Sequence, residues 1–149
     1  MRQARSGETD DELSEPIRSQ VREAGLIMKP PPVTPNTMFA LEATEYAQQH
    51  GKFMEFHHAA YKAYWDERKD LGKLDVLAEV ATSVSLDADE MIQCLETHEF
   101  SNQVMGQYQE ALQHGIRGIP TFVVGNLLFT GAHPYDIFKS AMNQYLESQ

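Results

Sequence analysis

The sequence predicts an α/β protein, and three observations support that class. Apolar residues recur at three- and four-residue steps through most of the chain between Asn36 and His114, as they do in amphipathic helices. A proline then leads into two short apolar runs separated by a Gly-Asn pair, which indicates a β-hairpin over 118–131. A last amphipathic segment follows Pro134. Helices followed by a hairpin and a final helix favour a mixed α/β domain over a helical bundle.

The N-terminal region divides at a proline-rich linker. Residues 1–13 are polar and charged, so we expect a disordered tail there. Ser14 is expected to cap a short helix that tolerates Pro16 in its first turn and ends at Gly25. Residues 29–35 contain four prolines, which predict an extended linker because proline fixes φ and disfavours a helical residue before it.

Four or five helices are expected between this linker and the hairpin, and one after it. The five cover about 36–50, about 53–67, a segment from Leu74 to Val84, a segment with an acidic start at 87–90, and one from Phe100 to Gly115. The predicted inward stripes of the fifth and the final helix are Phe100, Val104, Tyr108 and Ala111, and Tyr135, Phe138, Ala141, Met142 and Tyr145.

The first run of the hairpin is apolar almost without alternation. A strand such as Thr121–Val124 is typical of the interior of a sheet, where it has a neighbour on each side. Residues 127–129 supply one neighbour, and the sequence offers no convincing second. The short apolar run 26–28 is too brief to assign. It remains open as a strand that folds back onto this edge.

Composition excludes several classes of partner. The chain has 149 residues and a net charge of -10, which argues against binding nucleic acid or an anionic membrane surface. No apolar run approaches the length of a membrane span. A single cysteine excludes an intrachain disulfide, and with no export signal we expect a cytoplasmic protein.

The candidate chemical groups are few. Cys94 lies between Met91 and Leu95 on a helical stripe that should face the core, where a thiol behaves as a small hydrophobe. His57 and His58 are adjacent and point about 100° apart on a helix, so they cannot share a ligand site. No metal-ligand spacing or phosphate-binding loop occurs, and we expect neither a metal nor a cofactor.

Several blocks of sequence together resemble the DsbA-like thioredoxin family. They are Glu23-Ala24-Gly25-Leu26, Pro35-Asn36-Thr37, Ala40-Leu41-Glu42-Ala43, Gly51-Lys52-Phe53, Phe56-His57-His58-Ala59, the run 115–123 and Gly131-Ala132-His133-Pro134-Tyr135. The resemblance is greatest to the cytoplasmic branch that holds FrnE-type oxidoreductases and 2-hydroxychromene-2-carboxylate isomerases. It implies a DsbA-like thioredoxin domain over 14–149, with a helical insertion over about 36–114 and a thioredoxin-like C-terminal part over about 115–149.

The resemblance also implies what the chain lacks. In the family, a strand, a turn with a Cys-x-x-C pair, a helix and another strand precede the segment that resembles 14–25. We therefore expect an N-terminally truncated, partial thioredoxin-like fold without the redox pair and with no catalytic residue of its own. The resemblance implies that Ile119 and Pro120, at a cis proline bond, form the wall that pairs with a peptide or a glutathione-like thiol.

The expected function is that of a DsbA-family thiol–disulfide oxidoreductase-like protein that is inactive as this chain. One alternative is a non-catalytic binding or assembly module on a thioredoxin-like shell, and another is a glutathione-dependent isomerase or transferase. Because a lone hairpin leaves an apolar open edge, we also expect a homodimer through Thr121, Phe122, Val123 and Val124. A monomer in which residues 26–28 cover that edge is the competing outcome.

Overall fold

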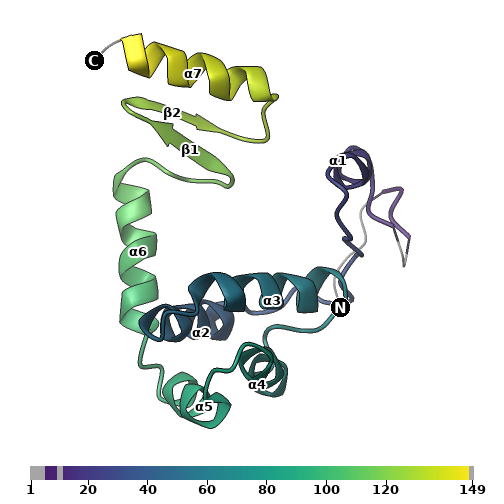
Figure 1. Cartoon of the computed structure of the whole chain (residues 1–149), viewed down its shortest axis with the longest axis vertical. Helices are drawn as coiled ribbons and strands as arrows, with labels where there is room; N and C mark the ends of the chain where they lie inside the picture. Colours follow the sequence, from purple (N-terminus) through teal and green to yellow (C-terminus); the bar gives the residue numbers. More distant parts are fainter. Residues whose placement is uncertain (1–5, 10–11, 148–149) are drawn as a thin grey trace. The chain divides into compact units, whose positions relative to one another are not determined.

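The computed structural model describes residues 6–9 and 12–147 of the chain. The chain divides into two compact units, Met1–Val104 and Met105–Gln149 (Figure 1). The predicted class is confirmed, since most of the described residues are helical and the strands form one small antiparallel sheet. The elements are α1 (Ile17–Glu23), α2 (Met38–Gln49), α3 (Phe53–Trp65), α4 (Leu74–Ser83), α5 (Ala88–Glu96), α6 (Ser101–Gln113), β1 (Thr121–Val124), β2 (Leu127–Thr130) and α7 (Tyr135–Glu147).

Helix α1 forms where it was predicted but begins differently. Its N-cap position is Pro16, with no side-chain cap, so the prediction that Ser14 caps the helix is wrong. Ser14 is 8% exposed, and its carbonyl oxygen accepts a hydrogen bond from the Arg18 N–H at 3.2 Å. Gly25 ends the helix as predicted, with a positive φ of 65° that suits a glycine.

The tail prediction for 1–13 falls partly on residues 1–5, 10 and 11, which lie outside the described residues. Of the others, Leu13 is buried, and Glu12 forms ion pairs with Arg18 and Arg22. The linker after α1 contains neither helix nor strand, and the Lys29 N–H bonds to the carbonyl oxygen of Trp65 at 2.8 Å. This bond fixes the start of the linker to the end of α3.

The core of the first unit lies among α2, α3, α4 and α5. Helix α2 packs against the other three, and α4 packs against both α3 and α5 (Figure 1). On α3, Phe56, Ala60 and Ala63 face this core and are all buried, whereas Phe53 at the start of the helix is 39% exposed. The largest fully buried side chains are Tyr46, Phe56, Leu77, Met91, Leu95 and Glu42. Glu42 is the one carboxylate among them, and its partner is described below.

Local sequence signals mark only some of the ends of these helices. The carboxylate of Asp87 caps α5 by accepting a hydrogen bond from the Glu90 N–H at 3.0 Å. Arg68, Ser85 and His98 follow the ends of α3, α4 and α5 with positive φ values of 59°, 62° and 54°. Residues other than glycine rarely adopt a positive φ, and no glycine in the sequence marks the ends of these three helices.

The predicted inward stripes of α6 and α7 are correct only in part. Phe100 and Val104 are buried, but Tyr108 is 56% exposed because the core of the first unit ends near Val104. On α7, Ala141 is buried, whereas Tyr135 and Met142 are 78% and 48% exposed. Two strands are too narrow to cover the whole apolar face of a helix this long.

The hairpin has the predicted turn and register. β1 pairs antiparallel with β2, so that Thr121 lies opposite Thr130 and Val123 lies opposite Leu128. Gly125 in the turn has a φ of 60°, and the ring of Tyr145 from α7 occupies the space that a Cβ would need there. A glycine is therefore required at this position for two reasons, backbone conformation and close approach.

One face of the hairpin is covered and the other is not. The Phe138 ring of α7 lies edge-on to Phe122 and Phe129, with ring centroids 4.7 and 5.3 Å apart. On the opposite face, Val123 is 60% exposed and Leu128 is 46% exposed. Residues 26–28 form no strand, and β1 pairs only with β2 within the described part of the chain.

Candidate functional site

Ile119 and Pro120 lie in the loop that leads from α6 into β1. The peptide bond between them is cis, as is that between Glu15 and Pro16. The carbonyl oxygen of Pro120 accepts a hydrogen bond from the Gly131 N–H at 2.8 Å, which extends the β1–β2 ladder by one position. The loop is thereby held against the start of the hairpin.

The side chain of Ile119 points into solvent from this fixed loop. It is 93% exposed, the highest value among the large apolar side chains of the described residues. Neither its N–H nor its C=O has a hydrogen-bond partner in residues 6–9 and 12–147. Ile119 therefore offers an apolar side chain, a donor and an acceptor to a ligand, a combination that suits an extended peptide backbone.

Thr121, the residue after Pro120, also stabilises the loop. Its hydroxyl donates to the carbonyl oxygen of Gly118 at 2.6 Å and lies 3.0 Å from the hydroxyl of Thr130. The two threonines are a directly opposed cross-strand pair on the uncovered face. These contacts hold the peptide groups on both sides of Ile119 in place, so a ligand would meet a preformed surface.

Cys94 lies on α5 in contact with the helical core of the first unit. Burial, followed by a hydrogen bond with Glu99 and the negative charge of Glu99 and Glu90, raises the pKa of its thiol above the ordinary value. A reactive cysteine needs the opposite environment, with a positive neighbour or a helix N-terminus that favours the thiolate. The surroundings of Cys94 are thus those of a structural thiol.

The histidines are not gathered at a common site. His57 stacks between Phe53 and Tyr61 along α3, with ring centroids 5.8 and 4.5 Å apart. His133 bonds through Nε2 to the carbonyl oxygen of Thr130 at 3.1 Å. No cluster of three or more metal-ligating side chains occurs among the residues that the structure describes.

A polar pair that the sequence does not reveal lies in the first unit. His98 Nδ1 is 2.9 Å from Oε1 of Glu42, and Glu42 is fully buried while the His98 side chain is 56% exposed. The imidazole also stacks on Phe39 with centroids 5.4 Å apart. Residues 56 positions apart carry no local signal of this pairing.

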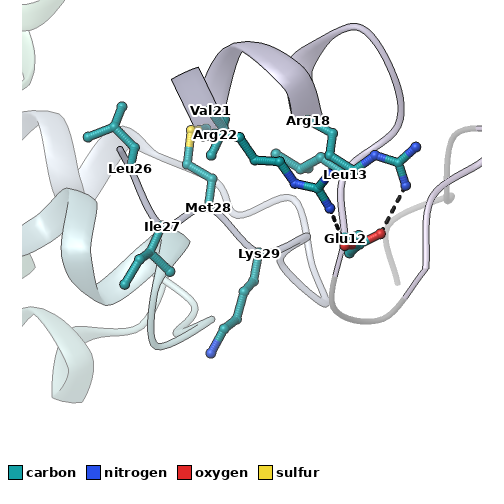
Figure 2. Close-up of a pocket in the computed structure, with 9 residues that line it drawn as sticks. All are labelled: Glu12, Leu13, Arg18, Val21, Arg22, Leu26, Ile27, Met28 and Lys29. Carbon is teal, nitrogen blue, oxygen red and sulfur yellow. Dashed lines mark hydrogen bonds and ion pairs between the residues drawn. The ribbon is translucent and has the colours of Figure 1, made fainter. Parts of the chain in front are cut away.

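A pocket of about 210 Å³ lies between α1 and the segment that follows it (Figure 2). Glu12 holds both arginines at its rim, with 2.9 Å from Oε1 to Arg22 and 2.9 Å from Oε2 to Arg18. The guanidinium groups are thus engaged by a carboxylate of the chain itself. The other residues that line the pocket are Leu13, Val21, Leu26, Ile27, Met28 and Lys29. None of these side chains is a thiol or another nucleophile suited to disulfide chemistry.

No helix in the described residues is both long and apolar enough to cross a lipid bilayer.

The chain is similar to known proteins both in sequence and in structure. The chain is 27% identical over 134 residues to the uncharacterised protein YwbO of Bacillus subtilis (strain 168), a match that covers 85% of this chain and 65% of YwbO. In structure it is similar to a probable DsbA oxidoreductase of Streptomyces coelicolor, with a TM-score of 0.76 at 22% identity, over 88% of this chain and 58% of that one. A candidate protein disulfide isomerase of Nitrosomonas europaea gives a TM-score of 0.65 at 18% identity, over 96% and 80%.

The chain therefore spans 65% of the length of YwbO and 58% of the length of the Streptomyces protein, both less than two thirds. The family is shown by a separate match, in which the model of the DSBA-like thioredoxin domain covers residues 7–143. That range includes the helical unit, the loop with Ile119 and Pro120, the hairpin and most of α7. On this match, the chain belongs to the DsbA-like thioredoxin domain family.

Proposed function

We propose that the chain supplies the substrate-binding wall of a DsbA-like thiol–disulfide oxidoreductase, and that Ile119 and Pro120 bind an extended peptide or a glutathione-like thiol there. The family match over 7–143 supports this class of reaction. The names of the two structural neighbours, a DsbA oxidoreductase and a disulfide isomerase, agree with it. Within the family we place the chain in the FrnE-like branch, on the sequence blocks it shares with that branch.

The observation that carries the proposal is the geometry of Ile119. Its side chain is almost fully exposed, and its two backbone polar groups are unpaired in the described residues. The neighbouring Pro120 carbonyl is occupied by Gly131, so a peptide would meet Ile119 as its backbone partner. One added donor–acceptor pair contributes about 0.5–1.5 kcal/mol, so binding through this wall alone is weak.

We further propose that the chain by itself does not reduce disulfides. Reduction requires a thiolate that attacks the disulfide and a second thiol that resolves the mixed disulfide. The sequence has one cysteine, and burial and neighbouring carboxylates raise the pKa of its thiol. The cytoplasm, where thiols are kept reduced, is the proposed compartment of a protein with one free cysteine.

Reduction of insulin by dithiothreitol, with and without the 149-residue chain, tests the catalytic half of the proposal. We expect no acceleration above dithiothreitol alone. Acceleration that disappears in Cys94→Ser would overturn the assignment of Cys94 as a structural thiol. Acceleration that persists in Cys94→Ser would indicate contamination by another reductase, which repurification identifies.

Titration with S-methylglutathione, followed by amide chemical shifts, tests the binding half. We expect shift changes at Ile119 and Thr121 and none at Ile27, which is also an exposed isoleucine but lies in the first unit. Ile119→Asp should weaken the response, and Ile27→Asp should leave it unchanged. Equal shift changes at the two isoleucines would contradict the proposal. So would the absence of a shift change at Ile119 with both this thiol and an extended apolar peptide.

A further inference from the structure

Arg117 lies two residues before Ile119, and it is a basic residue in an acidic part of the chain. Every other formally charged side chain from Leu74 to Phe138 belongs to an Asp or a Glu. Arg117 is exposed, and its guanidinium has no ion-pair or hydrogen-bond partner among the residues that the structure describes. The loop of the candidate site therefore carries a positive charge that the chain itself does not neutralise by a direct contact.

The backbone on both sides of Arg117 is fixed. The Ile116 N–H donates a hydrogen bond of 2.9 Å to a carbonyl oxygen in the last turn of α6. The Gly118 carbonyl oxygen accepts the hydrogen bond from the Thr121 hydroxyl. Because consecutive Cα atoms are about 3.8 Å apart, the Cα of Arg117 lies within about 7.6 Å of the Cα of Ile119. An arginine side chain can span that length, so the guanidinium can reach a group bound beside Ile119.

The hairpin next to Arg117 is free of competing charge. No Asp, Glu, Lys or Arg occurs from Gly118 to Tyr135. A guanidinium binds a carboxylate through two parallel hydrogen bonds, and this geometry makes arginine selective for that group. A ligand that carries a carboxylate therefore fits the loop better than an uncharged one.

We propose that Arg117 pairs with a carboxylate of the ligand, so that the loop selects a small anionic thiol of the glutathione type over an uncharged peptide segment. This inference rests on the proposed binding at Ile119 and Pro120. In glutathione the terminal carboxylate lies one residue beyond the cysteine. When the cysteine backbone pairs with Ile119, this carboxylate is within reach of Arg117. A segment from the interior of a protein chain has no terminal carboxylate to offer.

Two forms of one ligand test the selection. S-Methylglutathione and its glycyl methyl ester differ only in the terminal carboxylate, and the Ile119 amide shift reports the binding of each to the full chain. In about 0.15 M salt we expect the acid to bind roughly two- to fivefold more tightly, the size of an exposed ion pair. The net charge of -10 acts in the opposite direction, because it repels the more negative ligand. Arg117→Gln should therefore abolish or reverse the preference.

The outcomes separate this inference from the proposed function. Equal binding of the two forms to the wild type, or tighter binding of the ester, would overturn the role of Arg117 and leave the binding function intact. If neither form moved the Ile119 amide, both the binding function and the inference would be wrong.

Lys139→Gln is the matched control. It makes the same change in net charge in the same unit, but Lys139 is an exposed residue of α7 and not of the loop. We expect the ratio of the two affinities to stay unchanged in this variant, and Arg117→Lys to keep most of the preference because it keeps the charge. Equal loss of the preference in Lys139→Gln and Arg117→Gln would show a general effect of net charge and contradict the assignment to Arg117.

Salt provides a test that needs no substitution. At about 1 M ionic strength the Debye length falls to about 3 Å, so the preference of the wild type for the acid should nearly disappear. A preference that persisted at this salt concentration would indicate recognition of the terminal carboxylate by uncharged groups, and it would overturn the role of the Arg117 charge.

Discussion

His98 Nδ1 lies 2.9 Å from Oε1 of Glu42 and covers a carboxylate that is otherwise enclosed by the helical core. The second oxygen, Oε2, is buried and has no hydrogen-bond partner among the described residues. The imidazole is thus the main polar partner of a fully buried acid, and it comes from the turn between α5 and α6. This single contact links that turn to α2 across 56 positions of sequence.

Removal of the imidazole should therefore destabilise the first unit. We expect His98→Gly to lower the free energy of unfolding by about 1–3 kcal/mol, because it leaves the Glu42 carboxylate buried without this partner. Glycine is chosen because His98 has a positive φ, so the backbone itself is not penalised. Urea unfolding followed by far-ultraviolet circular dichroism measures the change.

Ser85→Gly is the matched control for that variant. Ser85 has a φ of 62° and is exposed, so glycine there relieves the backbone without removing a buried contact. We expect this control to be neutral or stabilising by up to about 1 kcal/mol. If the two glycine variants behaved alike, the Glu42–His98 contact would have no measurable role in stability.

Tyr46 predicts a pH dependence at the alkaline end. Burial, and then the hydrogen bond that its hydroxyl donates to Glu90 Oε2 at 2.9 Å, raise the pKa of Tyr46 above its ordinary value near 10. Because the folded pKa is raised, its contribution to stability is complete below the unfolded pKa and is lost as the pH rises above about 10. Unfolding free energies between about pH 8 and 11 should fall more steeply in the wild type than in Tyr46→Phe. Parallel curves would contradict the assignment.

Gly125→Ala should destabilise the hairpin more than glycine geometry alone explains. An added Cβ would meet the ring of Tyr145, in addition to the cost of a φ of 60°. Gly115→Ala is the control, since Gly115 also has a positive φ, of 76°, but nothing lies within 4 Å of its Cβ position. We expect about 1 kcal/mol for the control and at least about 1 kcal/mol more for Gly125→Ala, from thermal unfolding of the second unit. Equal losses would show that the Tyr145 ring moves aside freely.

Cys94 should react slowly with a thiol-specific reagent in the folded state. Its raised pKa lowers the thiolate fraction at neutral pH, and the thiolate is the species that reacts. Labelling by 5,5′-dithiobis(2-nitrobenzoic acid) near pH 7.5 should be slower than in the urea-unfolded chain by roughly tenfold. A folded-state rate equal to or above the unfolded rate would indicate an activated thiol.

The helices could be predicted from the sequence because their signals are local. The stripe through Phe56, Ala60 and Ala63 predicts α3 within two residues of its observed end, and the Gly-Asn pair at 125–126 predicts the hairpin turn. The cap at Ser14 could not be predicted correctly, because the carbonyl rather than the hydroxyl of this residue meets α1. The burial of α7 depends on how wide the sheet beneath it is, and helical periodicity alone does not contain that information.

The candidate site, too, could be predicted from the sequence only in part. A proline before an apolar run predicts the loop of Ile119 and Pro120, but not that the Ile119 side chain would be almost fully exposed. From the sequence alone, Glu42 and His98 are expected to be ordinary surface residues, because charged side chains are rarely buried. Only the packing of α2 beside the α5–α6 turn brings them together.

Trp65, whose carbonyl holds the Lys29 N–H, is the single tryptophan of the chain, and it lies in the first unit. Its ring packs edge-on to Tyr64, with centroids 4.8 Å apart. Intrinsic emission excited near 295 nm therefore reports on the helical unit alone, whereas the hairpin and α7 carry only tyrosine and phenylalanine. Melting curves from tryptophan fluorescence and from circular dichroism will coincide only if the two units unfold together, so their separation measures the cooperativity between the units.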